Sequence, residues 1–287
     1  MPTPSNLLPP ETSIGPVALT VPDLDRSQHF YQDILGLQPG NPRGTILDMQ
    51  AGVQPIVTLY VDPSAPPPPL HATGLYHMAI RVPSRLDFAR TLRHLANSGW
   101  RIEGAADHGV SEALYLSDPD QNGIEIYHDR PRESWPRSSS GSIQMGTDPL
   151  DVDGVLGLLE KKGGEWNGMA PKTVMGHVHL KVSNIPSSVA FYCDVLGFEL
   201  QQRYGSAAAF VSAGGYHHHI GMNTWESAAG PTSEPGSRGL RHFTIRLPDQ
   251  ASLEQALARV EAAGQPVQKD PQGYLLHDPA GNHILMI

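Results

Sequence analysis

Two stretches of the sequence, GPVALTVPDLDRSQHFYQDILGL at residues 15–37 and GHVHLKVSNIPSSVAFYCDVLGF at residues 176–198, align without a gap and share ten of 23 residues. Self-similarity over such a span indicates a duplicated structural unit. In each copy, apolar residues first alternate with a period of two, which predicts a strand. They then follow a helical pattern that ends at a Leu-Gly pair. The two halves of the chain therefore repeat one strand–helix unit.

A second pair of similar stretches opens two more units of the same plan. These stretches are GLYHMAIRVP at residues 74–83 and GLRHFTIRLP at residues 239–248. Each is followed by a helical pattern, at 86–98 and 253–263, and each unit closes through an Asp-Pro turn and a final strand. The sequence thus predicts four β-α-β-β-β modules, at about 14–62, 74–128, 175–225 and 239–287.

The modules group into two predicted domains. Modules one and two form a domain at 13–129, and modules three and four form a domain at 175–287. Residues 130–174 are predicted to be a linker that contains a short helix near 152–161. The segment PSAPPPPLHATG separates the first two modules.

Composition restricts the classes of function. The chain has 287 residues, 39% of them hydrophobic, which is enough for two folded cores. Its net charge of −9 and the absence of a Lys/Arg cluster argue against a nucleic-acid partner. The N-terminal sequence has no basic or apolar leader, and no apolar run is long enough to span a membrane, so we expect a cytoplasmic protein without a membrane partner. The 14 histidines, three of them consecutive in YHHHIG, favour metal or acid–base chemistry.

The four modules, the FY-D-LG helix endings and the DP-GN turns resemble the vicinal oxygen chelate superfamily over nearly the whole chain. Within it, SEALYLSDPDQNGIEIYHDRP and GGYHHHIG are similar to segments of the Bacillus-type catechol 2,3-dioxygenases, members of the type I extradiol group. The resemblance implies an α+β fold in which four βαβββ modules form two incomplete barrels. It also implies an Fe(II)-dependent extradiol dioxygenase, with a small catecholic substrate and dioxygen as partners and with possible homo-oligomers.

The resemblance implies a metal site of two histidines and one glutamate, which leaves one side of the ion open for substrate. The matching first-strand positions of modules one to four hold Pro16, His77, His177 and His242, and the last strands of modules two and four hold Glu125 and Leu285. Pairing module three with module four lacks a carboxylate, and pairing one with two lacks a histidine. Only modules two and three together collect His77, Glu125 and His177. We therefore predict these three as metal ligands, with modules paired two with three and one with four, and His242 without metal.

The same resemblance implies three catalytic residues. His218 matches the distal acid–base catalyst beside the dioxygen site. Tyr115 matches the substrate-binding tyrosine, and His108 is a looser counterpart of a second active-site histidine. The segment YHHHIGMNTW is predicted to form a strand, in which His218 points away from both neighbouring histidines. One of the three histidines is expected at the surface or behind the ligands. His179, two residues after His177, is on the ligand face and could support it.

Simpler interpretations stay open at this stage. His77 could be a buried strand histidine without a metal, and Glu125 could face solvent, which would remove the carboxylate ligand. His108 and Tyr115 could be an ordinary loop residue and a strand aromatic. Because one fold hosts many activities, the alternatives are another metal-dependent enzyme of the superfamily, such as a lyase, isomerase or thiol transferase, and a protein that binds an aromatic compound without chemistry.

Overall fold

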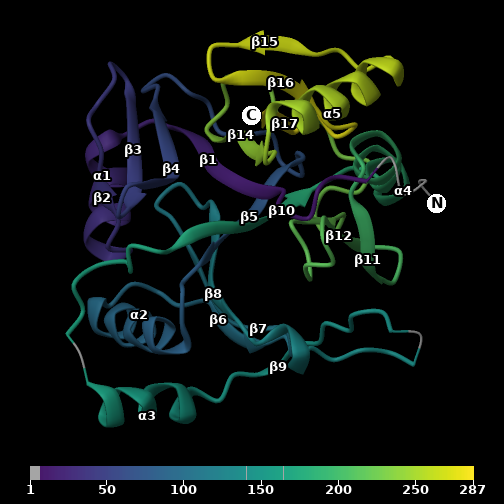
Figure 1. The fold of residues 1–287 in the computed structure, drawn as a ribbon. Helices are drawn as coiled ribbons and strands as arrows, with labels where there is room; N and C mark the ends of the chain where they lie inside the picture. Colours follow the sequence, from purple (N-terminus) through teal and green to yellow (C-terminus); the bar gives the residue numbers. More distant parts are fainter. Residues whose placement is uncertain (1–6, 140, 164) are drawn as a thin grey trace. The chain divides into compact units, whose positions relative to one another are not determined.

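The computed structural model describes residues 7–139, 141–163 and 165–287. Its helices and strands follow the modules expected from the sequence (Figure 1). Module one contains β1 (Ser13–Val21), α1 (Leu24–His29), the π-helix η2 (Phe30–Ile34), β2 (Gln38–Pro39), β3 (Ile46–Ala51) and β4 (Gln54–Val61). Module two contains β5 (Gly74–Arg81), α2 (Arg85–Ser98), β6 (Gly104–Asp107), β7 (Ser111–Ser117) and β8 (Gly123–Asp129).

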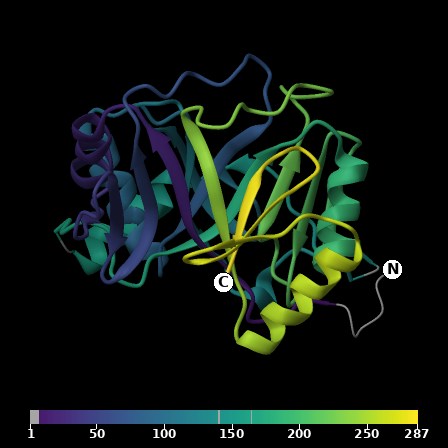
Figure 2. The same cartoon turned by 90° about the horizontal axis from the view of Figure 1, so that it is seen from above.

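The second half repeats this plan. Module three contains β10 (Val174–Lys181), α4 (Ile185–Ala190), the π-helix η4 (Phe191–Leu196), β11 (Glu199–Tyr204), β12 (Ala208–Ser212) and β13 (Ile220–Asn223). Module four contains β14 (Gly239–Arg246), α5 (Gln250–Ala262), β15 (Gln268–Asp270), β16 (Gly273–His277) and β17 (His283–Met286). Helix α5 runs beside the strands of its own module, with its apolar residues buried (Figure 2). The predicted α+β class is confirmed.

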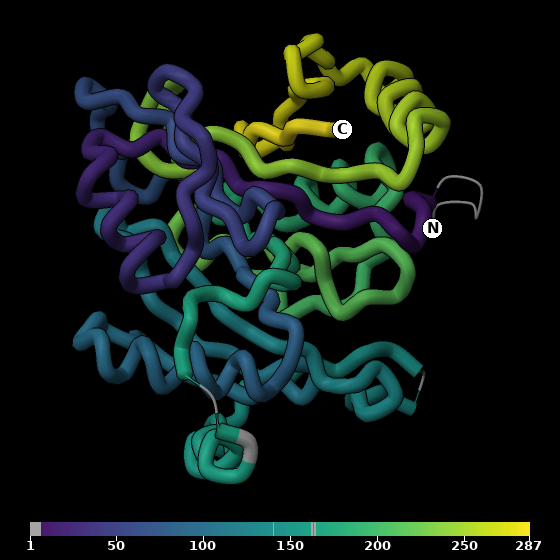
Figure 3. Tube along the Cα trace, turned by 60° about the vertical axis from the view of Figure 1, so that its left-hand side comes forward, coloured from purple at the N-terminus to yellow at the C-terminus, as the bar shows by residue number. Residues whose placement is uncertain are grey.

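The connection between the halves contains more structure than one short helix. It comprises the 3-10 turn η3 (Arg132–Ser134), the two-residue strand β9 (Asp148–Pro149) and α3 (Val152–Lys162). Figure 3 traces this connection in teal. Helix α3 lies beside α2 in Figure 1, and β9 pairs with β6 of module two. Much of the predicted linker is therefore structurally part of module two.

Two compact units are distinguished by their internal contacts. One consists of Gly176–Ile287 with Pro66–Tyr76 and, of the N-terminal residues that the structure describes, residues 7–18. The other consists of Leu19–Ala65 and His77–Met175. Strands β1, β5 and β10 contribute residues to both. The predicted domains, 13–129 and 175–287 with a linker at 130–174, stay a prediction.

The strands form two sheets with open-ended orders. The first has the order β15-β16-β17-β14-β1-β4-β3-β2 and the second has the order β11-β12-β13-β10-β5-β8-β7-β6-β9. Strand β14 of module four is therefore adjacent to β1 of module one, and β10 of module three is adjacent to β5 of module two. This order agrees with the predicted pairing of module two with three and one with four.

The FY-D-LG helix endings have the same structure in both halves. Each helix begins at a side-chain cap, Asp23 or Asn184, and changes to a π-helix at the Phe-Tyr pair. Each tyrosine then reaches the Asp-Pro turn of the following module. The Tyr31 hydroxyl donates to Asp118 at 2.8 Å, and the Tyr192 hydroxyl donates to Asp278 at 3.0 Å. Within each half, a buried hydrogen bond thus joins two consecutive modules.

Burial determines how these tyrosines titrate. Both phenol groups are completely buried, and burial raises their pKa well above 10, with the neighbouring aspartate charge acting in the same direction. Each tyrosine therefore stays a neutral donor over the physiological pH range.

Among the described residues, none of the helices has the length and apolar character needed to span a membrane.

Candidate metal centre

The parallel strands β5 and β8 bring His77 and Glu125 to one face of the sheet. His77 pairs with Gly123 and Ala79 pairs with Glu125 across these strands. Since residues two apart on a strand share a face, both side chains point the same way. The Nε2 atom of His77 lies 3.1 Å from a carboxylate oxygen of Glu125. Both residues are buried, at 7% and 3% exposure, so the carboxylate does not face solvent. A buried carboxylate requires a polar or cationic partner.

Tyr115 and His108 lie next to this pair. Tyr115 on β7 is the cross-strand neighbour of Glu125, and its ring lies 5.8 Å from that of His77. Its hydroxyl is 2.6 Å from Nε2 of His108, and Nδ1 of His108 is 2.7 Å from the carbonyl oxygen of Gly146. The sequence predicted both residues near the site, but the contact to Gly146 was not foreseen.

His177 occupies the corresponding first strand of module three and is 1% exposed. The His218 ring lies 4.0 Å from it, measured between ring centroids. His218 is in turn 2.8 Å from His217 between their Nδ1 atoms. The histidine predicted as the distal catalyst is thus in contact with a predicted metal ligand.

The prediction that YHHHIG lies on a strand is wrong. Two glycines with positive φ, Gly214 and Gly215, turn the chain after β12, and β13 begins only at Ile220. The three histidines lie in the intervening loop, so strand alternation does not apply to them. The His217 and His218 rings contact each other instead of pointing to opposite faces.

Burial excludes one of the two positions expected for a member of this run and leaves the position behind the ligands open. His217, His218 and His219 are exposed by 0%, 8% and 8%, so none of the three lies at the surface. His219 accepts a hydrogen bond from the backbone N–H of Ala213 at 3.1 Å and therefore holds the loop.

His179 has a different environment from the one expected for a residue that supports His177. Its Nε2 atom is 3.0 Å from the side-chain amide of Asn223. Its ring contacts those of Tyr76, Phe210 and Trp225. A glycine, Gly221, is paired with it on β13, and any Cβ there would lie 3.0 Å from the imidazole. His179 thus belongs to an aromatic cluster.

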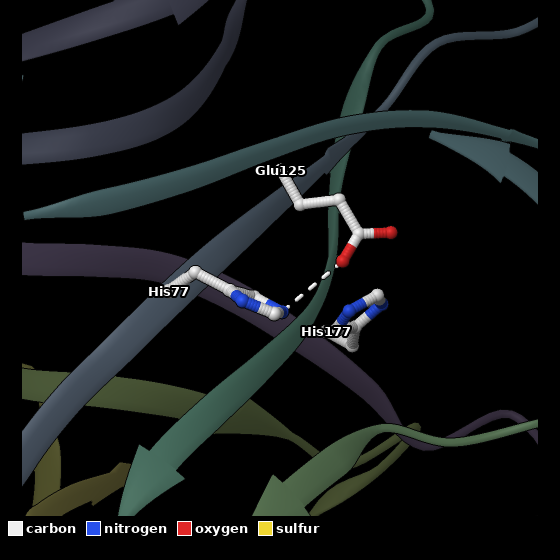
Figure 4. Close-up of side chains that lie close together, drawn as sticks. All are labelled: His77, Glu125 and His177. Atoms are coloured by element: carbon white, nitrogen blue, oxygen red, sulfur yellow. Dashed lines mark ion pairs between the residues drawn. The ribbon is translucent and has the colours of Figure 1, made fainter. Parts of the chain in front are cut away.

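His77, Glu125 and His177 form a possible metal-binding group. One potential ligand atom from each residue lies within 4.8 Å of those of the other two, and all three residues are buried. Figure 4 shows the three side chains pointing toward one another. Two imidazole nitrogens and one carboxylate oxygen are a donor set that suits a divalent transition metal and leaves coordination positions open. The residues present therefore fit the metal that the sequence resemblance implies.

His242 is not a member of this group. Strands β14 and β17 have the same register as β5 and β8. The position on β17 that matches Glu125 is occupied by Leu285. Burial, with a smaller contribution from the charge of Arg241, lowers the pKa of His242 to about 4. His242 therefore lacks the carboxylate neighbour that His77 has at the matching position, and the absence of a metal there stays a prediction.

Comparison with known protein families identifies the class of this chain. Residues 13–126 and 174–284 match the model of the Glyoxalase/Bleomycin resistance protein/Dioxygenase superfamily. The chain belongs to this superfamily, which is the membership that its repeated modules predict.

Two curated relatives cover nearly the whole chain. The chain is 41% identical over 282 residues to a catechol-2,3-dioxygenase of Bacillus subtilis (strain 168), covering 96% of this chain and 98% of that protein. It is 22% identical to a manganese-dependent 2,3-dihydroxybiphenyl 1,2-dioxygenase of Geobacillus genomosp. 3, covering 94% and 82%. The predicted resemblance to Bacillus-type catechol 2,3-dioxygenases is confirmed.

Solved structures share the fold at low sequence identity. Glyoxalase I from Zea mays superimposes with a TM-score of 0.58 at 15% identity, over 96% of this chain and 92% of its own. The cppA protein from Streptococcus pneumoniae TIGR4 gives a TM-score of 0.53 at 11% identity, over 96% and 97%. At such identities these structures support the fold alone.

Proposed function

We propose that the protein is an Fe(II)-dependent extradiol dioxygenase that cleaves the ring of catechol or of a substituted catechol. The observation that carries the proposal is the buried group of two histidines and one glutamate, in a chain 41% identical to a catechol-2,3-dioxygenase. Its substrates are then a small catechol and dioxygen.

The proposed ligands are His77, Glu125 and His177. A divalent metal held by them would supply Lewis acidity to a bound hydroxyl group and open positions for ligands from solution. The carboxylate of Glu125 also balances part of the metal charge inside a buried site, where an uncompensated charge would be costly.

His218 is proposed as the acid–base residue beside the metal. Its ring is in contact with His177, and its Nδ1 atom is close to that of His217. A hydrogen bond between these two nitrogens requires that one of them carries a proton and the other accepts it. His218 can therefore hold and exchange a proton next to the place where substrate would bind.

Tyr115 and His108 are proposed to bind and orient the substrate. Tyr115 lies beside His77 and Glu125, and its hydroxyl is held by His108. A fixed phenol oxygen can receive a hydrogen bond from a catechol hydroxyl and so orient the ring. Tyr115 would contact the substrate, and His108 would act on it through Tyr115.

The test is metal analysis of anaerobically purified protein together with oxygen uptake on catechol. We expect about one iron per chain, consumption of one O₂ per catechol and a yellow ring-opened product. Full activity with manganese in place of iron would keep the reaction and change the metal. If iron-loaded protein takes up no oxygen with any catechol, the proposal fails, and a lyase, isomerase, thiol transferase or binding protein of the same superfamily is favoured.

Two further expectations stay predictions. The cytoplasmic location rests on the sequence, and association into homo-oligomers is possible. Size-exclusion chromatography with light scattering will give the oligomeric state.

A further inference from the structure

The connection between the halves contributes a short segment to the surroundings of His108. This segment, residues 143–149, is called the strap here. Its strand β9 pairs with β6, so that Asp148 lies opposite Asp107. Further along the strap, the Gly146 N–H donates to the carbonyl oxygen of His108 at 3.2 Å. The strap therefore lies directly against the hairpin that carries His108.

The strap is attached at its start by a buried residue. Ile143 is 4% exposed although its neighbours on both sides are exposed, and it forms an antiparallel bridge with Arg137. The following N–H, from Gln144, donates to the carbonyl oxygen of Pro136 at 2.9 Å. Burial of Ile143 thus orders the strap before it reaches His108.

A network of charges holds the other side of the hairpin. The Arg130 guanidinium donates to Asp107 at 2.6 Å and to Glu112 at 3.2 Å. Glu112 is fully buried and also accepts from Arg85 and His128. The residue before His108 is therefore fixed from within module two, while the strap contacts His108 itself.

The strap determines which nitrogen of His108 carries the proton. A carbonyl oxygen can only accept, so the contact of Gly146 with Nδ1 at 2.7 Å requires a proton on Nδ1. In the neutral imidazole, Nε2 then has only a lone pair. In the 2.6 Å hydrogen bond between these residues, the Tyr115 hydroxyl is accordingly the donor and Nε2 of His108 is the acceptor.

This direction has a chemical consequence for Tyr115. A phenol has one O–H group, and while that group donates its hydrogen bond to His108 the oxygen can only accept further hydrogen bonds. A catechol hydroxyl is a donor. With the opposite tautomer of His108, Tyr115 would accept a hydrogen bond from Nε2–H and direct its own O–H toward the substrate.

We propose that the strap is a positioning element: through the Gly146 carbonyl it fixes the Nδ1–H tautomer of His108, which turns Tyr115 into an acceptor for a substrate hydroxyl. The last step rests on the proposed function, whereas the tautomer does not. Neither Ile143 nor any other strap side chain needs to touch the substrate.

The kinetic test compares two truncations in the same connection. Ile143→Ala removes the attachment of the strap, and Leu159→Ala is the matched control, because Leu159 is also buried but lies on α3. We expect Ile143→Ala to lower kcat/KM for catechol about 10- to 100-fold, the range seen when a residue that orients a functional group is lost. Leu159→Ala should leave it unchanged even if the Tm falls equally.

A double-mutant cycle shows whether the strap acts through His108. In a His108→Phe background, Ile143→Ala should cause no further loss of turnover, because the tautomer no longer exists to be fixed. Independent, multiplying losses would overturn the proposal.

Long-range ¹H–¹⁵N NMR of the full chain, freed of metal with a chelator, reads the tautomer directly. We expect Nδ1–H at His108 in the wild type and a mixed or Nε2–H form in a variant whose residues 143–147 are replaced by Gly and Ser. An unchanged Nδ1–H tautomer in that variant would overturn the proposal. If no catechol is cleaved at all, the proposed function fails, and the NMR result alone decides the role of the strap.

Discussion

Modules two and four share one backbone register but carry different chemistry. Each has a histidine at the same place in its first strand, His77 or His242. In each module, the residue two places after this histidine pairs with a residue of the last strand. That position holds Glu125 in module two and Leu285 in module four. The fold therefore decides where a side chain points, and a single residue decides whether the pair can hold a cation.

The two histidines differ accordingly in their electrostatic surroundings. His77 has a carboxylate oxygen 3.1 Å away. His242 faces an apolar partner position, and burial, with a smaller contribution from Arg241, lowers its pKa to about 4. Burial favours the neutral form of an imidazole, and at His242 the charge of Asp270 offsets this only in part. The following predictions exchange or remove the features that distinguish the two modules.

Replacing the carboxylate should have the largest effect. Glu125→Gln keeps the shape of the side chain and removes its charge, so we expect loss of bound metal and a fall in turnover of about 10³-fold or more, since metal catalysis is worth several kcal/mol. The control is Asp129→Asn, which changes a carboxylate on the same strand that is paired with Arg81. Full metal content and turnover in Glu125→Gln would show that Glu125 is not a ligand.

His218→Asn tests the proposed acid–base residue, which belongs to module three and contacts the proposed ligand His177. We expect turnover to fall by about 10²- to 10⁴-fold, the range for a lost acid–base group, while metal content and anaerobic catechol binding stay nearly intact. Metal analysis and the spectrum of the anaerobic complex separate the two effects. Normal turnover in this variant would remove His218 from the proposed chemistry.

Leu285→Glu gives module four the carboxylate of module two without the second histidine. Leu285 is 3% exposed, so the new charge is buried without the complete ligand set. We expect the free energy of unfolding to fall by about 3–5 kcal/mol, the cost of an uncompensated buried charge. Denaturant unfolding and metal analysis check this. A stable variant that binds a second metal ion would mean that two histidines are not required.

His242→Phe should produce the smallest effect, and it should appear only in acid. Because the folded-state pKa of about 4 lies below the ordinary 6.5, the unfolded chain binds more protons than the folded protein between these values. The free energy of unfolding therefore falls as pH is lowered from 6.5 to 4. His242→Phe should remove roughly 1–3 kcal/mol of this loss. An identical pH dependence in the variant would contradict the low pKa.

The sequence placed the three proposed ligands together because the family resemblance names the strand positions and a regular strand fixes the direction of each side chain. His77 and Glu125 each lie in a regular strand, and the repeat supplied the register through the matching positions of module four. Leu285 offers no carboxylate and Pro16 offers no imidazole. Only modules two and three together therefore supply two histidines and one glutamate.

The failures have equally physical causes. His217 and His218 were assigned to a strand, but the Gly214–Gly215 turn delays β13 until Ile220, and a loop has no fixed alternation. The contact between His108 and Gly146 was not predictable, since a backbone carbonyl leaves no residue signature.

The proposed ligands are distributed unevenly between the two halves of the chain. Two of them, His77 and Glu125, come from the first half of the sequence, and His177 comes from the second. The first half carries Pro16 where the second carries His177, and the second carries Leu285 where the first carries Glu125. Each half alone lacks one ligand, so a symmetric dimer of two identical halves would also lack a complete ligand set. The proposed ligand set is therefore complete only when both halves are present in one chain.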